Sequence, residues 1–231
     1  MRSVEIEDIR KQDYLYDEAI KTLRTNIQMT GKRIKTILIT SCYPNEGKSD
    51  ISISLAKELS SIGKKVLLID ADIRKSAYFS HFLVNQEVRG LSEFLSGQIT
   101  VKDLIYATNY PNMDIIFGGA PTPDPTGLLG DEMFGAFMKE IRGYYDYILC
   151  DTPPVGNIID AVLVARYCDG AVFVIEQGAV SYRFAQKSVN RIRKTGCRVL
   201  GSVLNKTDRR QDKYYKKYGQ YYQKTEVKKE A

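Results

Sequence analysis

Residues 41–49 read Ser-Cys-Tyr-Pro-Asn-Glu-Gly-Lys-Ser, directly after the apolar run Thr-Ile-Leu-Ile-Thr at 36–40 and directly before a helical pattern. A turn between a strand and a helix that closes in Gly-Lys-Ser is typical of a phosphate-binding loop, because its backbone N–H groups point at phosphate oxygens. In such a loop Lys48 contacts the β- and γ-phosphates and Ser49 binds Mg²⁺. The helix that begins near Gly47 adds the positive end of its dipole. The stretch predicts a nucleoside triphosphate site.

Three residues in this stretch depart from the usual pattern. Cys42 stands where the first glycine of G-x-x-x-x-G-K-[ST] belongs, and Asn45 replaces a glycine that is often found there. Asparagine tolerates positive φ, so we expect the turn to form. Asp50 follows Ser49 where a small hydroxyl residue is usual. Its charge suits the start of a helix but lies close to the phosphates, so it either weakens nucleotide affinity or helps to hold Mg²⁺.

Outward from the loop, strand-like and helix-like runs alternate. Strands are expected at 35–40, 65–70, 113–117, 146–151, 170–175 and 198–204. Helices are expected at 13–29, 47–62, 91–107 with a break near Gly97, 130–143, 158–167 and 181–195. Continuous apolar strands suit a parallel sheet that is buried on both faces. We predict an α/β fold of the P-loop NTPase type, with a mostly parallel sheet and helices on both faces.

The length of 231 residues predicts one main domain, and the 43% apolar content is enough for a core without metals or disulfides. We divide the chain into an N-terminal helical segment at 1–30, a P-loop domain at 31–207 and a tail at 208–231. The tail lacks an apolar stripe and is expected to be flexible. Residues 206–231 hold nine Lys/Arg against four Asp/Glu, which is most of the net charge of +6.

Composition also indicates the compartment. The four cysteines include no C-x-x-C pair and suit reduced, structural thiols, and the single histidine, His81, cannot form a histidine-based metal site alone. No run approaches the roughly 20 apolar residues of a membrane-spanning helix. The acidic start is unlike a signal peptide. The expected location is the cytoplasm.

Two strand ends carry carboxylates. The strand at 65–70 ends in Asp70-Ala-Asp72-Ile-Arg74, and the strand at 146–151 ends in Asp151 followed by Thr-Pro-Pro. Ligands of parallel sheets bind at the carboxyl ends of the strands. A phosphoryl-transfer site needs carboxylates there to hold a cation and a base near the attacking hydroxyl. Any one of these aspartates alone could simply cap a helix, but three behind a phosphate loop favour a nucleotide site.

Gly-Lys-Ser at 47–49, Leu-Ile-Asp-Ala-Asp-Ile-Arg at 68–74 and Ile-Leu-Cys-Asp-Thr-Pro-Pro at 148–154 resemble the Walker A, A′ and B motifs of bacterial tyrosine kinases. The resemblance is to the capsular and exopolysaccharide type of Gram-positive bacteria. It implies an ATP-dependent protein-tyrosine kinase with ATP and Mg²⁺ as cofactors. The implied catalytic residues are Lys48, Asp70, Asp72 and Asp151, and the implied metal ligands are Ser49, Asp70 and Asp151. The implied nucleotide-binding residues are Asn45, Glu46, Gly47, Lys48, Ser49, Asp50 and Asn205.

A tyrosine hydroxyl has a pKa of about 10, so a carboxylate that accepts its proton assists the transfer. Asp72 is our first choice for this base and Asp70 the second. Asn205-Lys-Thr-Asp also matches the guanine-binding N-K-x-D motif, but the resemblance places Asn205 beside adenine.

The N-terminal helix and its partners follow from the same resemblance. The family motif E-x-x-R-x-x-R, which mediates ring-like oligomerisation, here reads Glu18, Lys21 and Arg24. Lysine keeps the charge but loses the bidentate geometry of arginine. The alternative is an ordinary solvated helix face.

The family also implies a membrane activator whose cytosolic end completes the site, recruitment to the inner face of the membrane, and a cognate tyrosine phosphatase. Asp160 and Arg166 suit either contact with a neighbouring subunit or a surface helix.

The tail holds the candidate phosphoacceptors Tyr214, Tyr215, Tyr218, Tyr221 and Tyr222. Aromatic residues among lysines could bind single-stranded nucleic acid by charge and stacking. The alternative, that these tyrosines are substrates for a neighbouring subunit, fits better beside a phosphoryl-transfer site, and no nucleic acid is expected.

Two other functions stay open. A septum-site or partition switch ATPase would carry a second lysine early in the loop, and 41–46 has none. A nucleotide-sensing assembly subunit would have only vestigial kinase activity.

Overall fold

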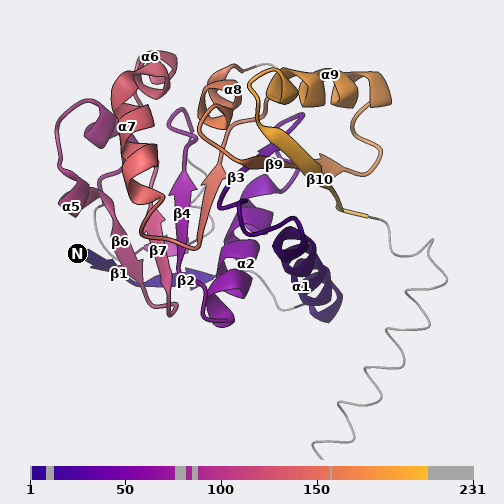
Figure 1. The fold of residues 1–231 in the computed structure, drawn as a ribbon, viewed down its shortest axis with the longest axis horizontal. Coiled ribbons are helices and arrows are strands. Elements are labelled where there is room, and N and C mark those ends of the chain that lie inside the picture. Colours follow the sequence, from indigo (N-terminus) through magenta and orange to yellow (C-terminus); the bar gives the residue numbers. More distant parts are fainter. Residues whose placement is uncertain (1, 9–12, 76–81, 85–87, 157, 208–231) are drawn as a thin grey trace, which may run out of the picture.

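The computed structural model describes residues 2–8, 13–75, 82–84, 88–156 and 158–207. The phosphoacceptor candidates in 208–231, and His81, lie outside the described residues. An eight-stranded sheet with the order β1-β6-β7-β4-β8-β3-β9-β10 forms the centre (Figure 1). Its strands are β1 Arg2–Val4, β3 Thr36–Ser41, β4 Val66–Asp70, β6 Tyr106–Thr108, β7 Met113–Ile116, β8 Tyr147–Asp151, β9 Gly170–Glu176 and β10 Arg198–Asn205.

The predicted parallel sheet is confirmed. The strands from β7 to β10 in the sheet order run parallel to one another, and their bounds agree with the predicted runs to within about two residues. β6 runs antiparallel to β7, and β1 pairs parallel with β6 at the sheet edge. Two short strands, β2 Ile6–Asp8 and β5 Phe82–Val84, form a separate antiparallel pair. β1, β2, β5 and β6 were not predicted from the sequence, because three residues are too few to show a periodicity.

The helices are α1 Tyr14–Met29, α2 Lys48–Ser61, α4 Leu91–Leu95, α5 Val101–Leu104, α6 Pro125–Gly130, α7 Glu132–Ile141, α8 Asp160–Ala165 and α9 Tyr182–Arg193. The break expected near Gly97 in the helix at 91–107 is confirmed, because α4 and α5 are separated by a turn in which Gly97 has φ 74°. Only the end of this prediction is wrong, since α5 ends at Leu104 and β6 begins at Tyr106. None of the helices in the described ranges is both long and apolar enough to cross a membrane.

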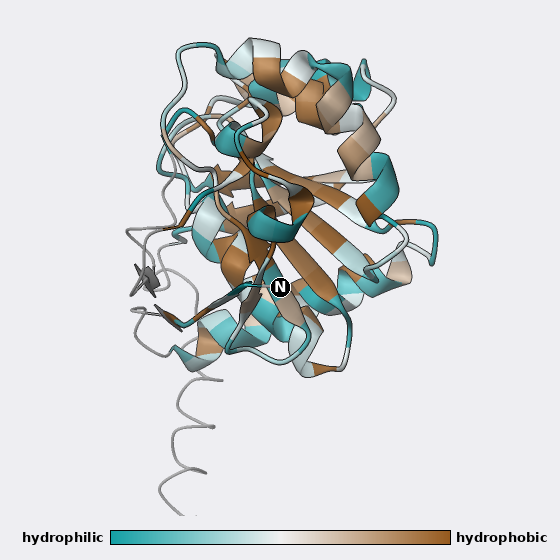
Figure 2. Cartoon of the chain, turned by 90° about the vertical axis from the view of Figure 1, so that its left-hand side faces the viewer, coloured by the Kyte–Doolittle hydropathy of each residue, from teal (hydrophilic) through white to brown (hydrophobic). Residues whose placement is uncertain are grey.

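Helices cover both faces of the sheet, as predicted, because alternate strand residues point to opposite sides. Ile37 and Ile39 of β3 pack with α1 and α2, whereas Leu38, between them, packs with the cluster that contains residues of α4, α7, α8 and α9. Figure 2 shows the apolar strands enclosed between helices whose outer sides are hydrophilic. The four cysteines are buried and free, as expected.

This topology brings the sequence motifs together. β4, β8 and β3 are neighbours in the sheet and run parallel, so the segments that follow them leave at the same edge. Asp70 at the end of β4 is in register with Asp151 at the end of β8. The loop at 42–47 follows β3, on the other side of β8. The sheet therefore positions both carboxylates beside the loop.

Candidate active site

The loop between β3 and α2 has the backbone that phosphate binding requires. Gly47 caps α2 with φ 85°, and Asn45 has φ 63°, which confirms that asparagine takes the left-handed conformation there. A Cβ atom on Gly47 would lie 2.2 Å from Nδ2 of Asn205 and 3.8 Å from Oδ2 of Asp50. Glycine fits both this close approach and the left-handed backbone at this position. Asp50 lies in the first turn of α2, beside the loop.

Glu46 stabilises the loop from inside. Its side chain is 1% exposed, its Oε2 accepts a hydrogen bond from the backbone N–H of Tyr43 at 2.6 Å, and its Oε1 accepts one from that of Glu176 at 3.0 Å. The carboxylate therefore joins the loop to the end of β9. Because both oxygens of this carboxylate are bonded within the protein, Glu46 can contact a nucleotide only through its backbone.

The end of β10 holds the same loop from a third side. Nδ2 of Asn205 donates to the carbonyl of Glu46 at 2.9 Å, and Nζ of Lys206 donates to the carbonyl of Asn45 at 2.6 Å. Lys206 also pairs with Glu176 at 2.8 Å. This role of Lys206 was not predicted. The signal in the sequence was its position directly after a strand, at the edge of the sheet where ligands bind.

Ser49, Asp70 and Asp151 form the candidate cation site. Oγ of Ser49 donates to Oδ2 of Asp151 at 2.6 Å, and the residue exposures are 6% for Ser49, 0% for Asp70 and 1% for Asp151. All three offer hard oxygen atoms, the ligand type that Mg²⁺ prefers, and two of them are carboxylates beside a phosphate-type loop. This donor set fits a magnesium ion that keeps part of its water shell.

Asp72 lies just beyond this group and is less buried. Its backbone N–H donates to Oδ1 of Asp70 at 3.1 Å, and its own Oδ1 accepts from the backbone N–H of Lys75 at 3.0 Å. Burial raises the pKa of Asp72 above its ordinary value, whereas the Lys75 N–H and the charge of Lys48 act in the opposite direction. A carboxylate with a raised pKa is a better proton acceptor, and Lys48 acts electrostatically on it.

The raised pKa of Asp72 predicts how the transfer rate and the stability of the fold depend on pH. If deprotonated Asp72 is the base, the rate of phosphotyrosine formation falls as the pH drops through a pKa above the ordinary value of 3.8. The folded state binds the Asp72 proton more tightly than the unfolded state, so this group lowers stability as the pH rises through its folded pKa. We expect Asp72→Asn to raise the melting temperature at neutral pH. An unchanged or lower melting temperature there would contradict the raised pKa.

Arg74 anchors the segment that carries Asp72. Its Nε and Nη2 donate to the two oxygens of Asp160 at 2.6 and 3.0 Å, and Nη2 also donates to the hydroxyl of Thr126 at 2.8 Å. Asp160 is 0% exposed, so the surface position considered for it in the sequence analysis is wrong: α8 turns this side chain inward. Arg166, which follows α8, is exposed and its guanidinium lies 6.0 Å from the ring of Tyr167.

The Arg74–Asp160 pair should matter for stability. Arg74→Met leaves the buried Asp160 charge without its guanidinium, and we expect a loss of about 3 kcal/mol in the free energy of unfolding. The matched control is Arg2→Met, which removes the exposed Arg2–Asp103 bridge and should cost less than about 1 kcal/mol. Urea unfolding of both variants decides, and equal losses would mean that the buried pair has no special role.

The three candidate oligomerisation residues lie on α1 and are paired within the chain. Nζ of Lys21 lies 2.6 Å from Oε1 of Glu18, and Nη1 of Arg24 lies 2.5 Å from Oε1 of Glu58 on α2. The Glu18–Lys21 pair is half exposed, whereas the side chains of Arg24 and Glu58 are each 21% exposed. Arg24 therefore fastens α1 to α2.

Comparison with known proteins adds to this geometry. The family model described as AAA domain matches residues 34–198. The tyrosine-protein kinase CpsD of Streptococcus pneumoniae is 38% identical over 218 residues, which is 94% of this chain and 94% of that protein. The kinase domain of the Escherichia coli tyrosine kinase ETK is similar in structure, with a TM-score of 0.79 and 29% identity over 86% of this chain and 78% of that one. The septum site-determining protein MinD from Pyrococcus horikoshii, complexed with Mg-ADP, is also similar in structure. Its TM-score is 0.65 and its sequence identity is 25%, over 76% of this chain and 71% of that one.

Proposed function

The chain belongs to the bacterial tyrosine kinases of the capsular and exopolysaccharide type, and from this membership we propose that it transfers the γ-phosphoryl group of Mg-ATP to the tyrosines of its own tail in trans. Through this autophosphorylation it would regulate polysaccharide synthesis and export. The observation that carries the proposal is the short Ser49–Asp151 hydrogen bond, because it joins the Gly-Lys-Ser loop to the carboxylate edge at which Asp70 and Asp72 lie.

Each side chain then has a role. The loop N–H groups and Lys48 hold the phosphates, and Ser49, Asp70 and Asp151 hold Mg²⁺, which supplies charge neutralisation when bound. Asp72 accepts the proton of the tyrosine hydroxyl while the tyrosine oxygen bonds to the γ-phosphorus. The bond between this phosphorus and the bridging oxygen breaks, and ADP leaves. Arg74 fixes the segment of Asp72 by its pair with Asp160. Asn205 keeps the loop closed from the β10 side, next to which an adenine ring would lie.

The experiment that tests this proposal measures two products of one reaction. The purified chain is incubated with Mg-ATP, and phosphotyrosine and free phosphate are both quantified. Phosphotyrosine in the tail that disappears in Lys48→Met supports the kinase. Phosphate without phosphotyrosine would instead identify a switch ATPase, and the absence of both products would identify a nucleotide sensor. The similarity to MinD in fold supports the second function, and the lack of a lysine in 41–46 speaks against it.

Transfer between subunits makes a separate prediction. A chain with Lys48→Met keeps its tail tyrosines but is expected to transfer phosphate about 10²–10³-fold more slowly, and a chain with all five tail tyrosines changed to phenylalanine can transfer but cannot accept. We expect the mixture to phosphorylate the Lys48→Met chain at a rate that rises with the concentration of the other chain. Phosphorylation of wild-type chains at a concentration-independent rate, with none in the mixture, would show transfer within one chain.

We further propose ring-like assembly through Glu18, Lys21 and Arg24, a membrane protein whose cytosolic end activates the kinase at the inner face of the membrane, and a tyrosine phosphatase that reverses the reaction. The Arg24–Glu58 pair matters for the ring-like assembly. If Arg24 contacts a neighbouring subunit, its guanidinium would leave the carboxylate of Glu58 and bind a carboxylate of that subunit instead. Sedimentation of the wild type and of Arg24→Ala tests it. A shift to smaller species in the variant supports the assembly, and identical profiles would exclude a role for Arg24.

A further inference from the structure

The outer side of α9 is a row of cations. Arg183, Lys187, Arg191 and Lys194 follow one another at spacings of four, four and three residues, so they lie on one face of the helix. Together with Gln186, Asn190 and Arg193 they line an open groove of about 700 Å³. None of these lining residues is acidic. Among the described residues, no salt bridge involves any of its five cations.

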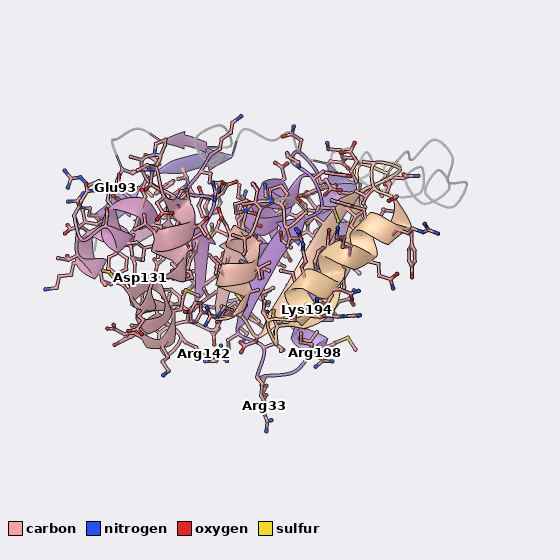
Figure 3. All side chains as sticks on the ribbon, turned by 90° about the horizontal axis from the view of Figure 1, so that it is seen from above. Arg33, Glu93, Asp131, Arg142, Lys194 and Arg198 are labelled. Atoms are coloured by element: carbon pink, nitrogen blue, oxygen red, sulfur yellow. The ribbon has the colours of Figure 1, made fainter. Side chains whose placement is uncertain are left out.

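The opposite side of α9 explains why this face stays outside. Ser188 and Ile192 are buried, and Phe184 and Val189 pack on the core. Arg191 also turns part of its guanidinium inward, where Nη1 donates to the carbonyls of Val155 and Gly156 at 2.8 and 2.6 Å. The remaining cations are exposed and concentrate positive charge without a function in the fold. Arg198, at the start of β10 and four residues after Lys194, is a further exposed cation that follows this end of the helix (both are labelled in Figure 3).

We propose that the groove of α9 binds the phosphorylated form of this chain's own tail; this inference rests on the proposed autophosphorylation. Arginine and lysine side chains in a row are the chemistry that recognises phosphate groups, and three of the five cations are arginines, which can bind phosphate in a bidentate manner. The groove between side chains suits an extended peptide better than the flat surface of a bilayer.

Charge makes the interaction depend on phosphorylation. The segment 214–222 carries two lysines and no acidic residue, so in its unmodified form it is repelled by α9. Each phosphate adds about −1.5 to −2 charges, and five of them reverse the sign of the segment. The modification itself thus creates the ligand.

Position makes the interaction feasible. Residues 194–197 join α9 directly to β10, and the helix packs against that strand. The helix therefore runs back along β10, and the carboxyl end of the strand lies toward the end of α9 that carries Arg183. Tyr214 follows Thr207 by seven residues, which span up to about 25 Å when extended, more than the roughly 18 Å length of α9. A short tether of this kind gives an effective concentration of the order of millimolar.

Binding of a synthetic peptide tests the proposal independently of whether the chain makes phosphotyrosine. The peptide comprises residues 208–231, with and without phosphate on its five tyrosines, and fluorescence anisotropy reports its binding to the full chain in the Lys48→Met form. We expect the phosphorylated peptide to bind at least about tenfold more tightly than the unmodified one, and more weakly as salt rises. The triple variant Arg183→Ala, Lys187→Ala, Lys194→Ala should lose this difference.

The control variant Lys32→Ala, Lys102→Ala, Lys139→Ala removes the same number of exposed cations elsewhere and should bind the phosphorylated peptide like the parent chain. Equal binding of both peptide forms, or equal loss in both triple variants, would overturn the proposal. Binding of vesicles with anionic lipid that depends on the α9 cations, without binding of the phosphorylated peptide, would also overturn it and assign the surface to membranes.

Discussion

Replacing Lys48 with methionine is expected to lower the rate of phosphotyrosine formation by about 10²–10³-fold. Lys48 is the first residue of α2, where its ammonium adds to the positive end of the helix dipole and acts on the Asp72 carboxylate. Methionine has a similar length and no charge, so the variant removes charge neutralisation at the phosphates while α2 keeps its packing. The initial rate at saturating Mg-ATP is the measurement.

Lys57→Met is the matched control for Lys48→Met. Lys57 lies on the same helix, but its ammonium is 4.6 Å from the ring centroid of Tyr110, away from the loop. We expect Lys57→Met to change the rate by less than about threefold, because it removes only this half-buried cation–π contact, nine residues along the helix from Lys48. Equal losses in the two variants would show that the rate depends on the overall charge or stability of α2, and Lys48 would then have no specific contact with the phosphates.

Asp72→Asn is expected to lower the rate by about 10²–10⁴-fold, the usual contribution of a positioned general base. Asparagine keeps the acceptor for the N–H of Lys75, so the segment retains its conformation. Binding of Mg-ATP should persist, because Ser49, Asp70 and Asp151 are untouched. The two measurements are the transfer rate and the affinity for a fluorescent ATP analogue with and without Mg²⁺.

Asp70→Asn is the counterpart of this variant. It should weaken binding of Mg-ATP, since Asp70 is fully buried and in register with Asp151. A normal transfer rate in Asp72→Asn together with lost Mg²⁺ dependence would mean that the two aspartates have the reverse roles.

The fold was predictable because its strands are long apolar runs that are buried on both faces, such as 66–69 and 171–174. The family was predictable because three motifs at strand ends have fixed chemistry. The short edge strands were not predictable from the sequence. Helix α6 was also missed, although Asp124 caps it and Pro125 is its first residue. Both of these are helix-start signals, but six residues are too few for a periodicity.

In the site, the strand-end aspartates followed from the sequence, whereas the contacts that shape the loop did not. Glu46, Asn205 and Lys206 act through backbone carbonyls and N–H groups of residues far along the chain. No local pattern encodes such contacts. Asp160 shows the same limit: a polar residue on a short helix suggested the surface, and only the position of Arg74 reveals why it is buried.

Site-resolved mass spectrometry of the chain after incubation with Mg-ATP tests whether the chain is a kinase that phosphorylates its own tail. We expect phosphotyrosine at Tyr214, Tyr215, Tyr218, Tyr221 and Tyr222, its loss in Lys48→Met and Asp72→Asn, and none of it when Mg²⁺ is removed. Phosphate release without any phosphotyrosine in 208–231, or phosphotyrosine that persists in Lys48→Met, would contradict it.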